Sequence, residues 1–264
     1  MKNVAKKLPI LLLLAGLFGA GSAQAQASGQ IQFEVTKRID PSQIRVVVNG
    51  QVVKPGSPDF PADIPETRTT SMSLAFAGSY AREKRESGAL RTMTTAVNGG
   101  GGIPQTTVLK APFEEITYVD LAGRAVATVL TVSKDNTTTT YRTDAPFVAP
   151  SGWILSSQTR KIAGYTCHKA TVPYQKDTYT VWYTTDLPFT YSPVRELMPE
   201  KGVVLQLEGE KEQYQATKVD LKAVAETEVR PAGTAQLVTA AELKDLRAKA
   251  QADFRQRMIE GEGR

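Results

Sequence analysis

The sequence predicts a mainly β protein of the α+β class: a large curved antiparallel sheet, or an open barrel or sandwich, with one C-terminal α-helix. Short apolar stretches alternate with polar residues at a period of two, and turn-forming residues separate these stretches at short intervals. A helical period emerges only near the C-terminus. We expect a signal peptide over residues 1–25, an antiparallel β domain over 26–235 and an amphipathic helix over 236–264.

The expected signal peptide is defined by charge and length. A basic start precedes an apolar run of about 13 residues, and small residues then lead to Ala25. The run is shorter than the roughly 18 apolar residues of a spanning helix, and the small residues suit signal peptidase. We therefore expect an exported protein, periplasmic or secreted, that is cleaved after Ala25 and does not span the membrane.

Composition narrows the classes of function. A hydrophobic fraction of 41% is enough for a substantial core. Removal of Lys2, Lys6 and Lys7 with the signal peptide lowers the formal net charge from +5 to +2. The remaining Lys and Arg are spread along the chain instead of clustering, so nucleic acid is not an expected partner.

The first strands follow the alternation of apolar residues. Residues 31–35 alternate, and a hairpin is expected across Asn49-Gly50, a dipeptide that tolerates positive φ. The prolines of Pro55–Pro65 predict a surface loop. A strand over residues 72–76 is expected to turn at Glu83–Gly88 into Leu90–Thr94.

The middle and last strands are expected to form further hairpins. The glycine-rich segment 98–104 lacks the Lys-Ser/Thr of a phosphate loop and predicts a flexible connection. Later strands are expected at Ile116–Leu121, Ala125–Ser133, Thr137–Thr143, Trp153–Leu155, Gly164–Val172, Thr178–Thr185, Val203–Leu207 and Tyr214–Leu221.

A helix is expected to begin after Thr239, because Thr239-Ala240-Ala241-Glu242 is a capping box. Apolar residues recur at helical spacing from Leu243 to Met258 and form one stripe. Docking on the sheet is the simpler interpretation. The alternative is that the 239–260 helix binds an envelope protein or a membrane surface.

The residues predict no metal, no cofactor and no catalytic constellation. A zinc site needs three or four ligands, and the chain has one Cys and one His. Cys167 and His168 are neighbours, so on a strand they would point to opposite faces. We expect Cys167 to be a buried thiol, with an intermolecular bridge or a reactive thiol as the alternative.

The second half of the chain resembles a family of exported proteins. Over residues 151–221 it is similar to the GLPGLI family of Bacteroidetes-type bacteria, whose biochemical role is unassigned. The residues that carry this resemblance are Gly164, Tyr165, Cys167, Lys169, Trp182, Asp186, Pro188, Pro199 and Gly202. The namesake motif is replaced by Leu197–Val204, which keeps a proline and a glycine. The resemblance implies a divergent member with a LolA-like fold, a curved sheet over helix with an apolar concavity.

Aromatic residues concentrate on the strands of this resemblance and are the candidate ligand-binding residues. They are Trp153, Tyr165, Tyr179, Trp182 and Tyr183, for which core packing is the alternative role. Our leading hypothesis is a non-enzymatic envelope protein that binds a lipid-like apolar ligand or a protein partner. The alternatives are an exported hydrolase that uses distant carboxylates, or an assembly partner of an outer-membrane complex.

Overall fold

The structure is a computed structural model that describes residues 28–40, 46–48, 51–53, 56–58, 65–86, 91–95, 105–109, 112–134, 137–147, 151–231 and 233–261. Several sequence features lie outside these residues. They are the expected signal peptide, the Asn49-Gly50 turn, most of the Pro55–Pro65 loop and the glycine-rich segment. The predictions made for them therefore stay predictions.

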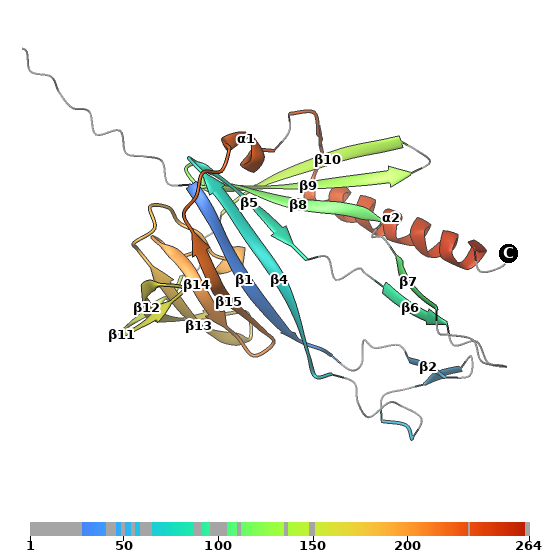
Figure 1. Cartoon of the computed structure of the whole chain (residues 1–264), viewed down its shortest axis with the longest axis horizontal. Helices are drawn as coiled ribbons and strands as arrows, with labels where there is room; N and C mark the ends of the chain where they lie inside the picture. The colour runs from blue at the N-terminus through green and yellow to red at the C-terminus, as the bar shows by residue number, and fades with distance from the viewer. Residues whose placement is uncertain are drawn as a thin grey trace, which may run out of the picture.

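One large, open sheet organises the chain (Figure 1). Its strands, in the order in which they lie side by side, are β11 (Ile154–Ile162), β12 (Tyr165–Tyr174), β13 (Asp177–Thr184), β14 (Val203–Glu208), β15 (Glu212–Asp220), β1 (Ser28–Arg38), β4 (Thr67–Ala77), β5 (Tyr80–Arg85), β8 (Phe113–Asp120), β9 (Ala125–Lys134), β10 (Thr137–Pro146) and β16 (Gln236–Leu237). Neighbours are antiparallel except β10 and β16, which run parallel. The predicted mainly β fold with an unclosed sheet and a C-terminal helix is confirmed.

Two runs of strands meet at the centre of the sheet. The first run spans β1 to β10 and the second spans β11 to β15, and β15 pairs with β1 so that Tyr214 lies opposite Val35. Two short hairpins form separate sheets: β2 (Val46–Val48) with β3 (Gln51–Val53), and β6 (Arg91–Thr95) with β7 (Gln105–Leu109).

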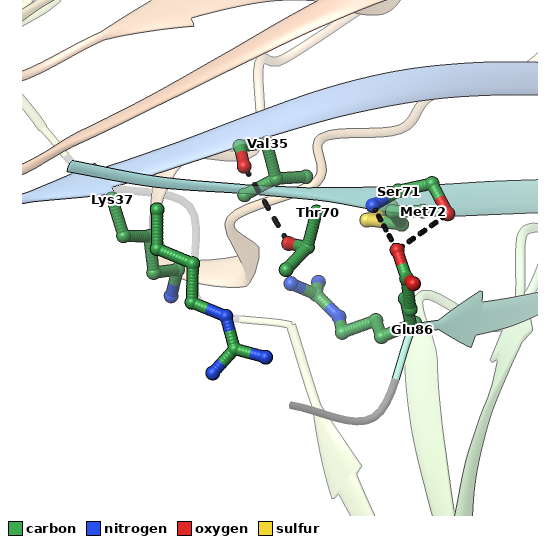
Figure 2. A pocket seen from close by; sticks show the side chains of 8 residues that line it. Val35, Lys37, Thr70, Ser71, Met72 and Glu86 are labelled. Atoms are coloured by element: carbon green, nitrogen blue, oxygen red, sulfur yellow. Dashed lines mark hydrogen bonds between the residues drawn. The ribbon is translucent and has the colours of Figure 1, made fainter. Parts of the chain in front are cut away.

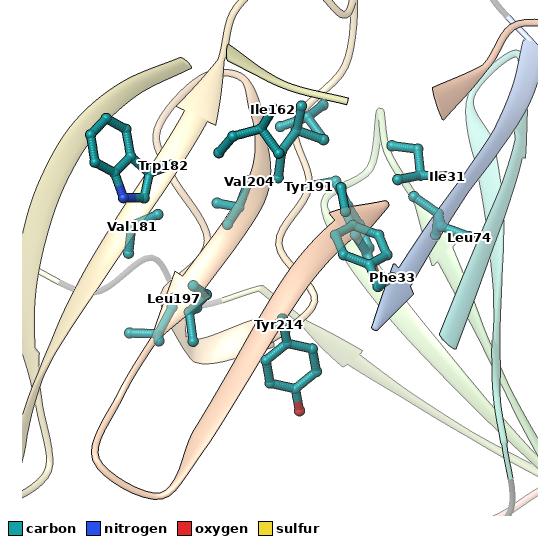
Figure 3. Packing of buried hydrophobic residues seen from close by; sticks show 14 of the residues in the cluster. Ile31, Phe33, Leu74, Ile162, Val181, Trp182, Tyr191, Leu197, Val204 and Tyr214 are labelled. Atoms are coloured by element: carbon teal, nitrogen blue, oxygen red, sulfur yellow. The ribbon is translucent and has the colours of Figure 1, made fainter. Parts of the chain in front are cut away.

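The main core joins the two runs through one face of β1 and β4. Ile31, Phe33 and Val35 are all buried, as their alternation predicts. The segment 185–202, between β13 and β14, folds against this face and contains the short 3-10 turn η2 (Arg195–Leu197). Figure 3 shows Tyr191 of this segment beside Phe33. Each large apolar side chain buried here contributes about 1.5–3 kcal/mol.

The predicted turn at Glu83–Gly88 is wrong. The chain turns earlier, at residues 78–79, and β5 pairs back on β4 with Phe76 opposite Ala81. Glu83 therefore lies inside a strand and is 2% exposed. The predicted pairing of Leu90–Thr94 with the strand before it is also wrong, because β6 pairs with β7.

The C-terminal segment returns to the sheet after β15 and contacts several of its strands. The four-residue helix α1 (Glu226–Val229) buries Val229 against β4 and β5, and β16 then joins the far edge beside β10. The helix α2 (Ala240–Gly261) begins at the predicted capping box. The Thr239 amide donates to the Glu242 carboxylate (2.7 Å), and the Glu242 amide donates to the Thr239 hydroxyl (3.2 Å).

The helix α2 docks on its own sheet. Leu243 and Ala250 are 3% and 7% exposed, and Leu246 and Phe254 of the same stripe are half-buried. Ion pairs join Arg247 to Glu115 on β8 (2.6 Å) and Asp253 to Lys134 on β9 (3.0 Å). Within the described part of the chain, no helix has the length and apolar character that crossing a membrane requires.

Candidate functional site

A cleft of about 1100 Å³ opens where β5 and β8 separate, and we call it the β5–β8 cleft. The two strands are paired only from Tyr80 opposite Asp120 to Glu83 opposite Thr117. Beyond that point β5 stays paired with β4 and β8 stays paired with β9. The chain between β5 and β8 includes the β6–β7 hairpin, so the two strands are not joined by a tight turn (Figure 1).

The lining of the cleft is polar and carries charges of both signs. It consists of Arg82, Glu83, Lys84, Arg85, Glu86, Pro112, Phe113, Glu114, Glu115, Ile116, Thr117, Thr131, Ser133, Arg195, Phe254 and Arg257. Two aromatic rings, Phe113 from β8 and Phe254 from α2, add half-buried apolar surface. Such a mixture suits a ligand that has many hydroxyl groups and some apolar faces.

A buried charge cluster forms the wall of the cleft on β5. Glu83 accepts a hydrogen bond from the Tyr191 hydroxyl (2.8 Å) and forms an ion pair with Arg85 (3.0 Å). The same guanidinium donates to the carbonyl of Pro193 (2.7 Å) and to the hydroxyl of Tyr214 (3.4 Å). These contacts tie β5 to the segment 185–202 and neutralise the Glu83 carboxylate inside the protein.

The cluster shifts the protonation of its members. Burial, and next the negative charge of Glu83, raise the pKa of Tyr191 well above its usual value of 10.0. Burial alone would lower the pKa of Arg85, but the charge and hydrogen bond of Glu83, together with Tyr191 and Tyr214, outweigh it and the pKa is raised. Tyr191 therefore stays a hydrogen-bond donor, and Arg85 stays a cation.

Arg195 reaches the cleft from η2 and is held by hydroxyl groups. Its Nη2 atom donates to the side chains of Thr117 on β8 (3.2 Å) and Thr128 on β9 (3.3 Å). The two threonines lie opposite each other in the β8–β9 register and are 8% and 7% exposed. Arg195 thus presents a fixed positive charge in the cleft.

Two smaller cavities meet the cleft at the end of β5. One, of about 230 Å³, is lined by Val35, Lys37, Arg68, Thr70, Ser71, Met72, Arg85 and Glu86. In it Glu86 accepts hydrogen bonds from the amide and hydroxyl of Ser71 (2.9 and 3.0 Å), which lower its pKa (Figure 2). The other, of about 780 Å³, shares Lys84 and Glu86 with the cleft.

The five aromatic residues predicted to bind a ligand lie in or against the core, and none of them lines the β5–β8 cleft. Tyr179 and Trp182 are 9% and 8% exposed, and Trp153, Tyr165 and Tyr183 pack against the core. The Arg160 guanidinium stacks 4.0 Å from the Trp182 ring, and Lys169 lies 5.9 Å from it. These contacts account for the aromatic residues by packing, while ligand binding by them stays a prediction.

The residues that suggested a family resemblance have local structural roles. Gly164 has φ +91° in the two-residue turn between β11 and β12, and Gly202 has φ +98°. The Asp186 amide donates to the Thr184 hydroxyl (3.2 Å). Pro188 is exposed and Pro199 is buried, both in the segment 185–202.

Cys167 is buried and not disulfide-bonded, and burial raises the pKa of its thiol to about 11. Its neighbour His168 is exposed, as the alternation of a strand requires. Among the described residues, no group of three or more Cys, His, Asp or Glu side chains is arranged to hold a metal ion.

Sequence reasoning missed the residues that build the cleft, namely Glu83, Arg85 and Arg195. One signal was present: residues 81, 83 and 85 alternate along β5, so Glu83 and Arg85 fall on the same face of the strand as the apolar Ala81. No comparable local signal marks Arg195.

Comparison with known proteins assigns the chain to a family. The fold is mainly β, with one large open sheet and a polar cleft beside β5 and β8. The model of a family described as "N-glycanase peptide, N-terminal domain" matches residues 103–245, more than half of the chain, so the chain belongs to this family. No curated protein matches this chain.

Two solved structures of PNGF-II are similar in fold. The structure in space group P21 has 16% identity and a TM-score of 0.52, and the match covers 85% of this chain and 34% of that one. The structure in space group C2 has 16% identity and a TM-score of 0.47, with 83% and 33% covered. The chain thus spans about a third of the length of these structures.

The family match corrects two sequence-based interpretations. The resemblance to the GLPGLI family and to a LolA-like, Bacteroidetes-type envelope protein is wrong, because the matching family is the N-glycanase N-terminal domain. The motif misled because a glycine in a positive-φ turn, a buried Cys and a Trp packed on a strand are ordinary features of hairpins.

The leading hypothesis of lipid-like ligand binding is overturned by the same match, which indicates a glycan-related protein. The match does not test the hydrolase and assembly alternatives, which stay predictions. The packing agrees with this correction. Leu187, Tyr191 and Leu197 pack in the same core as the candidate aromatic residues, and Leu243 and Ala250 of the helix stripe are buried.

Proposed function

We propose that this chain is a non-catalytic binding module that recognises N-linked glycans, free or on a glycoprotein, through the β5–β8 cleft. The observation that carries the proposal is membership in a family named for N-glycanase, an enzyme that acts on N-linked glycans. The match is to an N-terminal domain, and the chain spans about a third of the PNGF-II structures. Recognition apart from cleavage is therefore the role we assign to it.

The chemistry of the cleft supports a saccharide ligand. Its volume of about 1100 Å³ is at the upper end of common ligand sites, which suits several sugar rings. Carboxylates and guanidinium groups can bind sugar hydroxyls by charge-assisted hydrogen bonds. Phe113 and Phe254 offer flat apolar faces against which the C–H faces of sugar rings can pack.

The partners of the cleft carboxylates support a role in binding and not in catalysis. Glu83 is engaged by Tyr191 and Arg85, Glu115 by Arg247, and Glu86 by Ser71. A general acid or base needs access to the reacting group. Three of the four glutamates that line the cleft are therefore committed to structural partners and poorly placed for that task.

Export is part of the proposal. The basic start and short apolar run of residues 1–25 support secretion or release into the periplasm, where glycoproteins from outside the cell could be met.

Calorimetric titration with an N-glycosylated peptide and with the same peptide lacking the glycan tests the proposal. We expect only the glycosylated peptide to bind, and mass spectrometry to recover it intact. Glu114→Ala, at an exposed carboxylate of the cleft, should weaken binding, whereas Glu200→Ala, an exposed glutamate outside the cleft, should not. Equal binding of both peptides would contradict glycan recognition, and a released glycan would contradict the non-catalytic role.

A further inference from the structure

Arg195 is a cation of the cleft that has no acidic partner among the described residues. It is half-buried, and the groups that hold it are the neutral hydroxyls of Thr117 and Thr128. Taking a cation partly out of water is costly unless it is paired. Among the described residues, no carboxylate forms an ion pair with this guanidinium.

Three of the four glutamates that line the cleft already have partners. Both oxygens of Glu83 are used, one by Tyr191 and the other by Arg85. Glu115 is paired with Arg247 on α2, and Glu86 accepts from Ser71 on β4. The positive charge of Arg195 is therefore not neutralised by these acids.

The hydrogen bonds of Arg195 also fix its orientation. Both threonine hydroxyls accept from the Nη2 atom, and no described residue accepts from Nε or Nη1. A guanidinium carries five N–H donors in a rigid plane, and that plane matches a carboxylate with two parallel hydrogen bonds. A threonine hydroxyl that accepts from Arg195 keeps its own hydrogen to donate to a ligand oxygen.

We propose that Arg195 binds the carboxylate of an acidic sugar, so that the β5–β8 cleft prefers acidic saccharides to neutral ones. This inference rests on the proposed function, because it names the class of glycan that the cleft takes. A carboxylate could also come from an acidic side chain of a glycosylated polypeptide. We assign it to the sugar because Phe113 and Phe254 line the same cleft and give sugar rings surfaces to pack on.

Calorimetry with three glycopeptides of one peptide length tests the inference. The first carries an N-glycan whose branches end in a carboxylate-bearing sugar, and the second carries the same glycan after that sugar is removed. The third carries the trimmed glycan on a peptide with one added Asp. We expect the first to bind about tenfold more tightly than the other two, which corresponds to about 1.4 kcal/mol.

Two variants and a control locate the effect. Arg195→Gln should bind the acidic and the neutral glycopeptide with equal affinity, so that the tenfold preference is lost. Arg195→Lys keeps the charge but not the planar fork and should retain part of the preference. Arg255→Gln, the same chemical change at an exposed site of α2 outside the cleft, should retain all of it. Thermal unfolding of each variant shows that it is folded.

The outcomes separate the inference from the proposed function. Equal affinities of the wild-type protein for the acidic and neutral glycans would overturn the inference and leave glycan recognition standing. Retention of the full preference by folded Arg195→Gln would overturn it as well. If the added Asp raises the affinity as much as the acidic sugar does, the carboxylate that Arg195 binds belongs to the polypeptide, and the inference is overturned as well. Failure to bind any of the three glycopeptides would overturn both proposals.

Discussion

Replacement of Tyr191 by Phe probes the buried cluster that supports the cleft. The Tyr191 ring is fully buried, and its hydroxyl donates to Glu83, which is 2% exposed. The substitution removes only that hydroxyl, so the ring contact with Phe33 at 6.4 Å can persist. A hydrogen bond to a charged group contributes about 1.5–3 kcal/mol. Because Arg85 still compensates Glu83, we expect a loss of about 2 kcal/mol.

Urea unfolding measures this loss as a lower midpoint with an unchanged slope. For a chain of this size, the same loss lowers Tm by about 4–8 °C. Tyr174→Phe is the matched control, because the Tyr174 hydroxyl accepts only from exposed Gln175 (3.0 Å). That variant should stay within about 0.5 kcal/mol of the wild type. If Tyr191→Phe is as mild as Tyr174→Phe, the reasoning about the cluster is wrong.

The pH dependence of stability gives a second test of Tyr191. Its pKa is raised in the folded state by burial and by Glu83, so the folded protein holds the phenol proton more tightly than the unfolded chain does. The resulting stability is present in full below the unfolded pKa of about 10 and is lost as pH rises above it. When the pH is raised from neutral to above about 10, the free energy of unfolding should therefore fall less for Tyr191→Phe than for the wild type.

Three further predictions concern the strand turns, the helix cap and the thiol. Gly202→Ala should cost more than Gly164→Ala in urea unfolding. Each substitution costs about 1–2 kcal/mol because the residue has positive φ. An added Cβ at Gly202 would also lie 2.5 Å from the Thr184 carbonyl oxygen, whereas an added Cβ at Gly164 would have no atom within 4 Å. Equal losses of stability in the two variants would contradict this prediction. Thr239→Ala should lower stability by about 1 kcal/mol at neutral pH through loss of the cap of α2, and an unchanged Tm would argue against it. Cys167 should react with a thiol reagent only as the protein unfolds in urea, since burial raises its pKa to about 11; rapid labelling of the folded protein would show that it is accessible.

Much of the fold was predictable because its signals are local. The alternation of Ile31, Phe33 and Val35 and the capping box at Thr239 each act within a few residues, and both have the predicted structure. The strand β5 was not predicted, because Glu83 and Arg85 belong to a polar stretch that was expected to form a turn. The inward position of Glu83 is stabilised by Tyr191, which lies 108 residues later and cannot be inferred from neighbouring sequence.

The candidate site was not predictable for a related reason. The β5–β8 cleft exists because the pairing of two strands stops at Glu83 opposite Thr117, and this register is a property of the whole sheet. Arg195 belongs to a segment that crosses from the other half of the sheet to reach Thr117 and Thr128. The aromatic residues drew attention in the sequence, but large apolar side chains first serve the core.

A crystal structure of the protein grown with an N-glycosylated peptide tests the central claim most directly. We expect electron density for the glycan in the β5–β8 cleft, against Phe113 and Phe254 and within hydrogen-bonding distance of Arg195. Density for the glycan at another surface, such as the strands β11 to β13, with an empty β5–β8 cleft, would contradict the claim.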